Sequence, residues 1–296
     1  MFTNYAIAVA LLPLLSAAPL APVLISSIAS PAPVGSLVTW SAKVASPQDN
    51  PLWYRFMVRA PDGARRIVKD FGPDGSFQWS PVEREGSYAI EVAIRNLTTG
   101  EQAETIVPFI VTSNVAGGKA VVNPTSHPLV FLYSAPACPL GSAMLVYFLN
   151  AQNGALQNTP SKRCDGLFSM NFYIAGLRGS SPYYLRHHLN TRGVLTEGPL
   201  LTLTSGPVPA DVPGVSAVMS PAKSSSEQVL LASSLFTKFV ATDLEGNTIW
   251  YYPDSILFLT HPEPGGTFFG LHENHAGDPA ARYENRGQPQ NPRPKR

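Results

Sequence analysis

Apolar and polar positions alternate along several short segments near the start of the chain. Residues 36–44 read SLVTWSAKV and residues 88–94 read YAIEVAI, each with a large apolar side chain at about every second position. A period of two indicates a β-strand with one buried face, because successive side chains of a strand point to opposite sides. The turn sequences PDG at 61–63 and NLTTG at 96–100 separate such segments. This pattern predicts a β-sandwich over residues 21–113.

The strand spacing specifies the kind of sandwich. Strand-like segments recur at intervals of roughly 8 to 12 residues, which is typical of an immunoglobulin-like fold. After a linker at 113–122, residues 120–205 hold a second series of strand-like segments, including SAMLVYFLNA at 142–151. Within this series, Gly176 to Tyr183 reads G-L-x-x-x-x-x-Y. This spacing resembles the corner of fibronectin type III modules in which a Tyr hydroxyl bonds to the loop backbone, so the second unit is predicted to be fibronectin-like.

A proline-rich connector, GPVPADVPGVS at 206–216, leads to a third β-rich segment. Its hairpin signal is FVATDLEGNTIWYYPD at 239–254, where Gly246 and Asn247 suit a turn that needs positive φ. Residues 273–296 contain few apolar side chains, and we expect them to form a disordered tail. The fold class predicted for the chain is therefore all-β.

Composition supports this fold class and excludes one class of partner. Only 14% of the 296 residues are charged, while 29 are proline and 23 are glycine. A chain this rich in turn-forming residues fits many short strands. The 21 basic and 20 acidic side chains leave a net charge of +1, with no run of Lys or Arg. Nucleic-acid binding therefore has no electrostatic basis in the sequence.

The N-terminal segment, residues 1–20, carries no charged side chain and includes the apolar run AIAVALLPLLSAA. This run suits the apolar segment of a secretory signal, so we expect a periplasmic or extracellular location. The segment also lacks the Lys or Arg that usually opens such a signal. A simple apolar arm, and with it a cytoplasmic location, is therefore the alternative. Pro13 and the shortness of the run argue against a membrane-spanning helix.

Cys138 and Cys164 are the only cysteines, and both lie in loop-like sequence, SAPACPLG and PSKRCDGL. An even count in a chain with features of a secreted protein predicts one disulfide. By the chain-entropy estimate such a bond would add roughly 3 kcal/mol of stability. Two unrelated thiols are the alternative. No histidine stands at zinc-site spacing from either cysteine, so no metal site is predicted.

Three tryptophans and one sequon in the first unit have both a functional and a structural interpretation. Trp40, Trp53 and Trp79 could form a carbohydrate platform, but tryptophan in a sandwich is more often a core residue. Asn96 opens the glycosylation sequon N-L-T, which also spells an ordinary hairpin turn. The structural interpretation is preferred for both features.

His187 and His188 are adjacent in a predicted strand. Neighbouring strand residues point to opposite faces, so the two imidazoles are not expected to share a metal ion. We expect one of them to face solvent and the other to be partly buried.

Residues 228–274 resemble a known family. The hairpin contains D-x-x-G-N-x-x-W from Asp243 to Trp250, and LTHPEPGGTFFGL follows at 259–271. These motifs resemble the first β-propeller blade of bacterial arylsulfotransferase-like proteins. Upstream, SMNFYIAGLR and YYLRHH are similar to the sandwich that precedes the propeller in that family. The resemblance covers about residues 21–274 and implies two sandwiches followed by a truncated propeller blade over 217–272.

What the family implies is transfer of a sulfuryl group from an aryl sulfate to a phenol acceptor through a covalent histidine intermediate. The catalytic His and Arg residues of that family come from later blades. A propeller needs at least about four blades to close, and this chain has room for about one. No residue can therefore be assigned as catalytic, and no cofactor is implied. The imidazoles near this segment, which match no catalytic position, are His261, His272 and His275, and the tail adds Arg282 and Arg286.

Three interpretations stay open. The first is an arylsulfotransferase-like chain with only a remnant of the catalytic propeller, arising from a truncated or frameshifted reading frame and inactive alone. The second is an exported β-sandwich module for binding or adhesion, without enzymatic activity. The third is a subunit whose propeller is completed by another chain.

Overall fold

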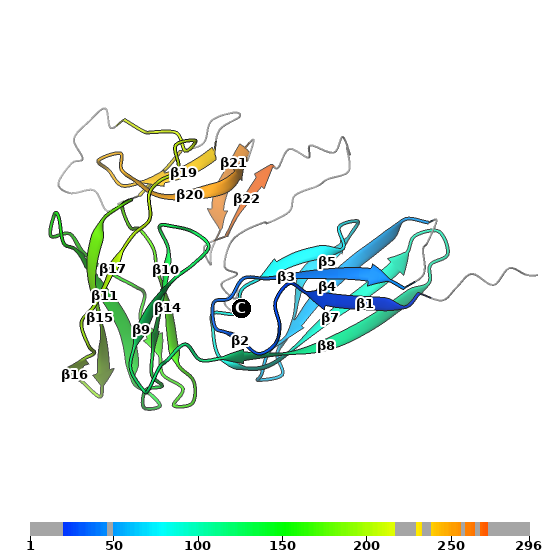
Figure 1. Cartoon of the computed structure of the whole chain (residues 1–296), viewed down its shortest axis with the longest axis horizontal. Coiled ribbons are helices and arrows are strands. Elements are labelled where there is room, and N and C mark those ends of the chain that lie inside the picture. The colour runs from blue at the N-terminus through cyan, green and yellow to red at the C-terminus, as the bar shows by residue number, and fades with distance from the viewer. Residues whose placement is uncertain are drawn as a thin grey trace, which may run out of the picture.

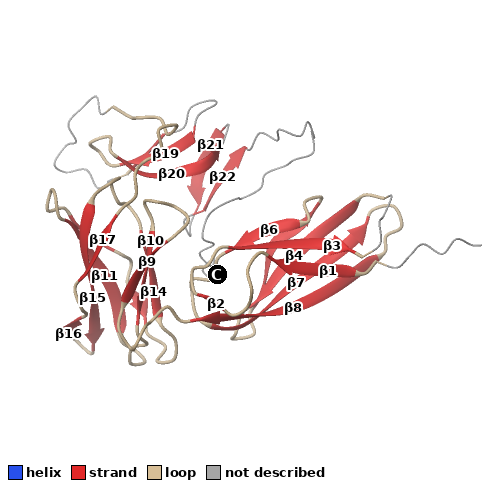
Figure 2. Cartoon of the chain, in the orientation of Figure 1, coloured by secondary structure: helices blue, strands red, loops and turns tan. Residues whose placement is uncertain are grey.

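The computed structural model describes residues 20–45, 50–216, 229–232, 238–255, 258–263 and 267–271. The regular elements among them are all β-strands, which confirms the all-β class (Figures 1 and 2). The predicted tail at 273–296 and the predicted signal segment, except for Leu20, lie outside the described residues.

The N-terminal strands form two sheets. The smaller has the order β1-β3-β6 and the larger the order β2-β8-β7-β4-β5. All neighbours pair antiparallel except β2 and β8, which pair parallel. The strands are β1 (Pro22–Ser26), β2 (Ala32–Pro33), β3 (Val38–Val44), β4 (Leu52–Arg59), β5 (Arg65–Gly72), β6 (Ser76–Trp79), β7 (Gly86–Asn96) and β8 (Gln102–Thr112).

These two sheets bury one common core, as the alternating pattern predicts. Trp40 of β3, Phe56 of β4 and Ile90 of β7 are fully buried in it. Trp40 meets Phe109 of β8 edge to face, with ring centroids 5.5 Å apart. Aromatic pairs in this geometry add to the hydrophobic contribution of the buried area. The first unit is therefore a β-sandwich.

The middle of the chain forms a second sandwich, to the left of the first in Figure 1. Its smaller sheet has the order β14-β10-β9, and its larger sheet is built around β11 and β15. The strands are β9 (Val121–Pro124), β10 (Phe131–Ala135), β11 (Ala143–Asn150), β12 (Leu156–Asn158), β13 (Lys162–Arg163), β14 (Met170–Ile174), β15 (Pro182–Thr191), β16 (Val194–Glu197) and β17 (Leu201–Thr204).

The predicted tyrosine corner is present in the second sandwich. The Tyr183 hydroxyl accepts a hydrogen bond from the Arg178 backbone N–H at 2.9 Å, and Leu177 is fully buried beside it. A second corner occurs in the first sandwich, where the Tyr88 hydroxyl donates to the Arg84 carbonyl at 2.9 Å. Each bond ties a strand to the loop before it.

The two sandwiches touch through side chains as well as through the linker. Ser169 of the second unit donates two hydrogen bonds to the Glu85 carboxylate, at 2.8 Å from its backbone N–H and 2.7 Å from its hydroxyl. Leu132 of β10 packs into the core of the first sandwich. Asn114, in the linker, donates to the Val34 carbonyl at 2.8 Å. These contacts fix the junction between the units.

The C-terminal strands lie above the second sandwich in Figure 1. β18 (Leu230–Ala232), β19 (Lys238–Thr242) and β20 (Thr248–Ser255) form a three-stranded sheet, while β21 (Phe258–Glu263) and β22 (Thr267–Leu271) form a separate two-stranded sheet. The predicted hairpin at 239–254 is present, and Gly246 in its turn has φ 86°.

A propeller blade is a single four-stranded sheet. Among the described strands, β21 pairs with β22 and does not extend the sheet formed by β18, β19 and β20. The described residues therefore form a three-stranded sheet and a separate hairpin, and the blade inferred from the resemblance is not seen in them.

Candidate functional site

The larger sheet of the first sandwich has one buried and one open face. Along β8 the exposed positions alternate, and Ile106 and Ile110 are 54% and 49% exposed on the open side. On the same side lie Ile67 of β5, 51% exposed, and Trp53 of β4, 37% exposed. We define the arginine–aromatic face as these four residues together with Arg55, Arg59, Arg65, Phe71, Glu91 and Arg95.

Three strands build a stack at the centre of this face. The guanidinium carbons of Arg55 (β4) and Arg95 (β7) lie 4.2 Å and 4.3 Å from the centroid of the Phe71 ring (β5). Trp53 lies directly opposite Arg95 in the register. Cation–π contact and the planar fork of the guanidinium hold both arginines in fixed orientations.

The two arginines of the stack differ in their partners. Arg55 Nε donates to Asp70 Oδ1 at 2.8 Å. The pKa of Asp70 is lowered, first by the hydrogen bond from the Phe71 backbone N–H and then by Arg55. Arg95 contacts no carboxylate within the described part of the chain, and its Nε is buried without a hydrogen-bond partner. Arg95 is only half-buried, so an acceptor from outside would have to approach the guanidinium at its Nη groups and not at the enclosed Nε.

A buried carboxylate lies beside the stack. Glu91 is only 2% exposed and is held by Arg59 Nη2 at 2.9 Å and Arg65 Nη2 at 2.5 Å. Both arginine side chains are about half exposed. The two arginine side chains thus cover the Glu91 carboxylate, so the solvent-exposed charge of this region is positive. The two arginines supply the hydrogen bonds and the opposite charge that replace the hydration which the carboxylate loses on burial.

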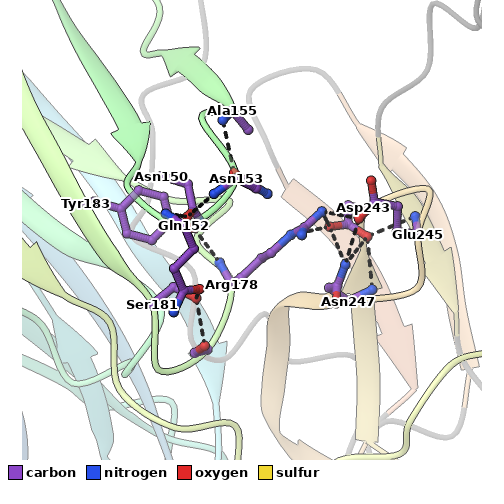
Figure 3. Close-up of polar contacts among 11 residues, drawn as sticks. Asn150, Gln152, Asn153, Ala155, Arg178, Ser181, Tyr183, Asp243, Glu245 and Asn247 are labelled. Carbon is purple, nitrogen blue, oxygen red and sulfur yellow. Dashed lines mark hydrogen bonds and ion pairs between the residues drawn. The ribbon is translucent and has the colours of Figure 1, made fainter.

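A polar joint connects the second sandwich to the C-terminal sheet (Figure 3). Arg178, in the tyrosine-corner loop, reaches the β19–β20 turn, where its Nε donates to Asp243 Oδ2 at 2.8 Å and its Nη2 to Glu245 Oε2 at 2.6 Å. Asp243 Oδ1 also accepts from the Asn247 backbone N–H at 2.9 Å. The acidic turn of the D-x-x-G-N motif therefore both shapes the hairpin and anchors it.

His127 forms the second part of the joint. Its Nε2 lies 3.1 Å from the Tyr251 carbonyl oxygen, and its Nδ1 lies 3.1 Å from the Leu129 backbone nitrogen. The imidazole stacks on the Trp250 ring at 6.0 Å with an interplanar angle of 10°. Leu129, Val212, Val240 and Tyr251 pack into one buried apolar cluster. Sequence reasoning missed His127 because Tyr251 and Trp250, which it contacts across the joint, lie on a distant strand.

The predicted disulfide is present. Cys138 and Cys164 are bonded, with their Cα atoms 5.5 Å apart, and both are buried. The bond links the loop before β11 to the loop that carries Ser169 toward the first sandwich. The alternative of two free thiols is thereby excluded.

The tryptophans separate into two roles. Trp40 and Trp79 are buried in the first core, as preferred from the sequence, whereas Trp53 lies on the arginine–aromatic face. Asn96 of the sequon is buried, and its side-chain oxygen accepts from the backbone N–H groups of Thr98 and Thr99 at 2.9 Å and 3.0 Å. Asn96 thus acts as a turn residue.

The two adjacent histidines have separate surroundings, but both are partly buried, so the expectation that one of them faces solvent is wrong. The Tyr133 hydroxyl and His187 Nδ1 are hydrogen-bonded at 2.8 Å, and burial raises the pKa of Tyr133 to about 12. His188 lies 3.4 Å from Glu197 and against the Tyr147 ring. Over the described ranges no three metal-ligating side chains gather, and no helix there could span a membrane.

The histidines and arginines considered near the C-terminal segment lie at or beyond the edge of the described residues. His261 belongs to β21, and His272, His275, Arg282 and Arg286 lie outside the described residues. No catalytic residue was assigned among them from the sequence.

Comparison with known proteins gives structural likeness alone. No protein-family model matches the chain, and no curated protein sequence matches it. The chicken interferon gamma receptor alpha chain matches at 13% identity and a TM-score of 0.25, over 57% of this chain and 92% of the receptor. A segment of two fibronectin type III domains from chicken tenascin matches at 13% identity and a TM-score of 0.24, over 62% of this chain and 97% of the segment.

The FN1–FN3 domains of chicken CNTN1 match at 12% identity and a TM-score of 0.24, over 59% of this chain and 65% of that structure. TM-scores this low do not establish a shared fold. The assignment of two tandem β-sandwiches therefore rests on the sheet pairing and the cores of the chain itself.

Proposed function

We propose that this chain is a non-catalytic binding module of an exported protein, and that its arginine–aromatic face binds an acidic surface of a protein partner. The observation that carries this proposal is the stack of Arg55, Phe71 and Arg95 beside Trp53. Trp and Arg are the residue types that most often dominate the binding energy of protein interfaces. Here they project from paired strands, so little conformational entropy is lost on binding.

Charge indicates the chemistry of the partner. The open face carries four arginines and three carboxylates, and one of these carboxylates, Glu91, is buried beneath its arginines. The arginines are at 55, 59, 65 and 95, and the carboxylates are Asp70, Glu91 and Glu104. An acidic side chain on a partner would pair with the Arg95 guanidinium. The exposed isoleucines would contact apolar side chains around it, as at the core of a protein interface.

Export is supported by the disulfide. Cys138 and Cys164 are bonded, and disulfides of this kind persist in oxidising compartments. We place the protein in the periplasm or outside the cell on this ground. The two sandwiches are proposed to be immunoglobulin-like and fibronectin-like modules, because each contains a tyrosine corner.

Site-specific photo-crosslinking tests the face. A benzophenone side chain at Ile106, in the full chain expressed in its source cells, should yield a discrete protein adduct. Arg95→Ala or Trp53→Ala should reduce that adduct about tenfold, as expected for the loss of a dominant interface residue. Lys43, exposed on the opposite sheet, serves as the control position for both the crosslinker and an alanine substitution.

An adduct from Lys43 equal to that from Ile106, or an Ile106 adduct insensitive to both alanine variants, would overturn the proposed face. An adduct of twice the mass of the chain would identify a second copy as the occupant and overturn the acidic partner.

The arylsulfotransferase-like interpretation is the second candidate. The feature that favours it is the D-x-x-G-N-x-x-W hairpin, whose Asp243 and Gly246 form the turn that the resemblance implies. We expect the purified chain to transfer no sulfate from an aryl sulfate to a phenol. Transfer that is lost on substitution of His261, His272 or His275 would contradict the non-catalytic proposal.

A further inference from the structure

The joint between the second sandwich and the C-terminal sheet contains one group that titrates near neutral pH. His127 lies in the loop between β9 and β10, and Tyr251 lies in β20, 124 residues further along the chain. The contact therefore holds together two parts of the molecule that the sequence separates widely.

The hydrogen bonds fix the protonation state of His127. The Leu129 backbone N–H can only donate, so Nδ1 must be an unprotonated acceptor. The Tyr251 carbonyl can only accept, so Nε2 must carry the proton. Both bonds are satisfied together only by the neutral Nε2–H tautomer.

A second proton would break this arrangement. Protonated Nδ1 would point its N–H at the N–H of Leu129, which would lose its acceptor. A buried donor left without a partner costs about 1–3 kcal/mol. The positive charge would also be buried against the apolar cluster around Tyr251, where it loses hydration; the parallel Trp250 ring at 6.0 Å would offset only part of this cost.

The charged groups around His127 offer little compensation. Its own loop, residues 125–130, contains no other titratable side chain. On the packed sheet, Lys238 of β19 lies over the Tyr251 ring at 5.8 Å, and Asp211 from the connector pairs with Lys238 at 2.6 Å. None of the described carboxylates contacts the imidazole.

We infer that His127 is a pH-sensitive latch, which keeps the C-terminal sheet docked on the second sandwich at neutral pH and releases it on mild acidification. The direction of its titration supports this. Burial lowers the pKa of His127 below the ordinary 6.5, against a smaller opposing effect of the bond to Tyr251. The released form then binds the proton more tightly than the docked form. Docking is fully stable above pH 6.5 and weakens as the pH falls below that value.

Hydrogen exchange of the full-length chain tests the latch. Protection factors of the β19–β20 amides should fall between about pH 7.5 and about pH 5.5, a range that lies above ordinary carboxylate pKa values. The protection factor can change by about tenfold for each unit by which docking lowers the pKa of His127. The β7 amides, in the first sandwich, should keep their protection.

His127→Gln supplies a side chain that cannot titrate, and its β19–β20 protection should become independent of pH. His188→Gln is the matched control, since this histidine lies on the larger sheet of the second sandwich, and it should keep the response of the unchanged protein. The latch would be overturned if β19–β20 protection in the unchanged protein did not change with pH, or if His127→Gln kept the full pH dependence.

If His127→Gln does not fold, an NMR titration of the unchanged protein decides. The His127 ring must then titrate below 6.5 in step with the loss of protection, and a titration at or above that value contradicts the inference.

Discussion

Single polar side chains close the loops of both sandwiches. The Tyr183 hydroxyl accepts from the Arg178 N–H at 2.9 Å and from the Asn150 side chain at 3.2 Å. The same loop carries the Arg178 guanidinium to Asp243. One hydroxyl thus supports both the corner and the polar joint.

Tyr183→Phe should lower the free energy of unfolding by about 1–3 kcal/mol, because it leaves the Arg178 N–H without an acceptor. Urea denaturation measures the change. Tyr184→Phe is the control, since the Tyr184 ring is half exposed on the other face of β15, and it should cost less than about 0.5 kcal/mol. Equal losses in the two variants would argue against the corner bond as the cause.

At the level of elements, the disulfide joins two loops that flank the larger sheet of the second sandwich. The loop of Cys164 continues through Asp165, whose carboxylate accepts from the Leu167 and Phe168 N–H groups at 2.9 Å and 3.1 Å. It ends at Ser169, which contacts Glu85. The covalent bond therefore stiffens the segment that meets the first sandwich.

Replacing both cysteines with alanine should lower the stability of the second sandwich by roughly 3 kcal/mol, because the unfolded chain regains the entropy of the open loop. Thermal unfolding with and without a reducing agent measures this. Reductant should destabilise the unchanged protein and leave the double variant unaffected. A double variant as stable as the unchanged protein would show that the bond contributes little.

For the whole molecule, the orientation of the sandwiches depends on contacts between them. Glu85 and Ser169 share two hydrogen bonds, and Arg84 lies over the Phe168 ring at 5.2 Å. Leu132 adds apolar contact with the first core. These contacts should make the pair of sandwiches move as one body.

Glu85→Ala should loosen that junction, because it removes the acceptor of both Ser169 donors. Distances between spin labels placed on β3 and β15 should broaden, while the stability of each sandwich changes little. Glu104→Ala, at an exposed position of β8, is the control and should leave the distribution narrow. A narrow distribution in Glu85→Ala would mean that Leu132 and the linker alone set the orientation.

Local rules allowed much of the fold to be predicted. Alternation assigned the inward face of β3 and β7, since the strand repeat of two leaves only one way to bury the larger side chains. Turn chemistry located the β19–β20 hairpin at Gly246. The spacing from Leu177 to Tyr183 gave the corner bond. All of these features depend on residues close together in the sequence.

The candidate binding face and the latch could not be predicted in this way. Arg55, Phe71 and Arg95 come from three strands, and their stacking depends on strand order and register, which sequence spacing does not specify. His127 meets Tyr251 across 124 residues. The sequence by itself determined the all-β class, the strand faces and the tight turns, because these follow from backbone geometry and local hydrogen bonds. The tertiary structure decided which arginines, aromatic rings and histidine meet, because those contacts depend on how distant strands pair and how the sheets pack.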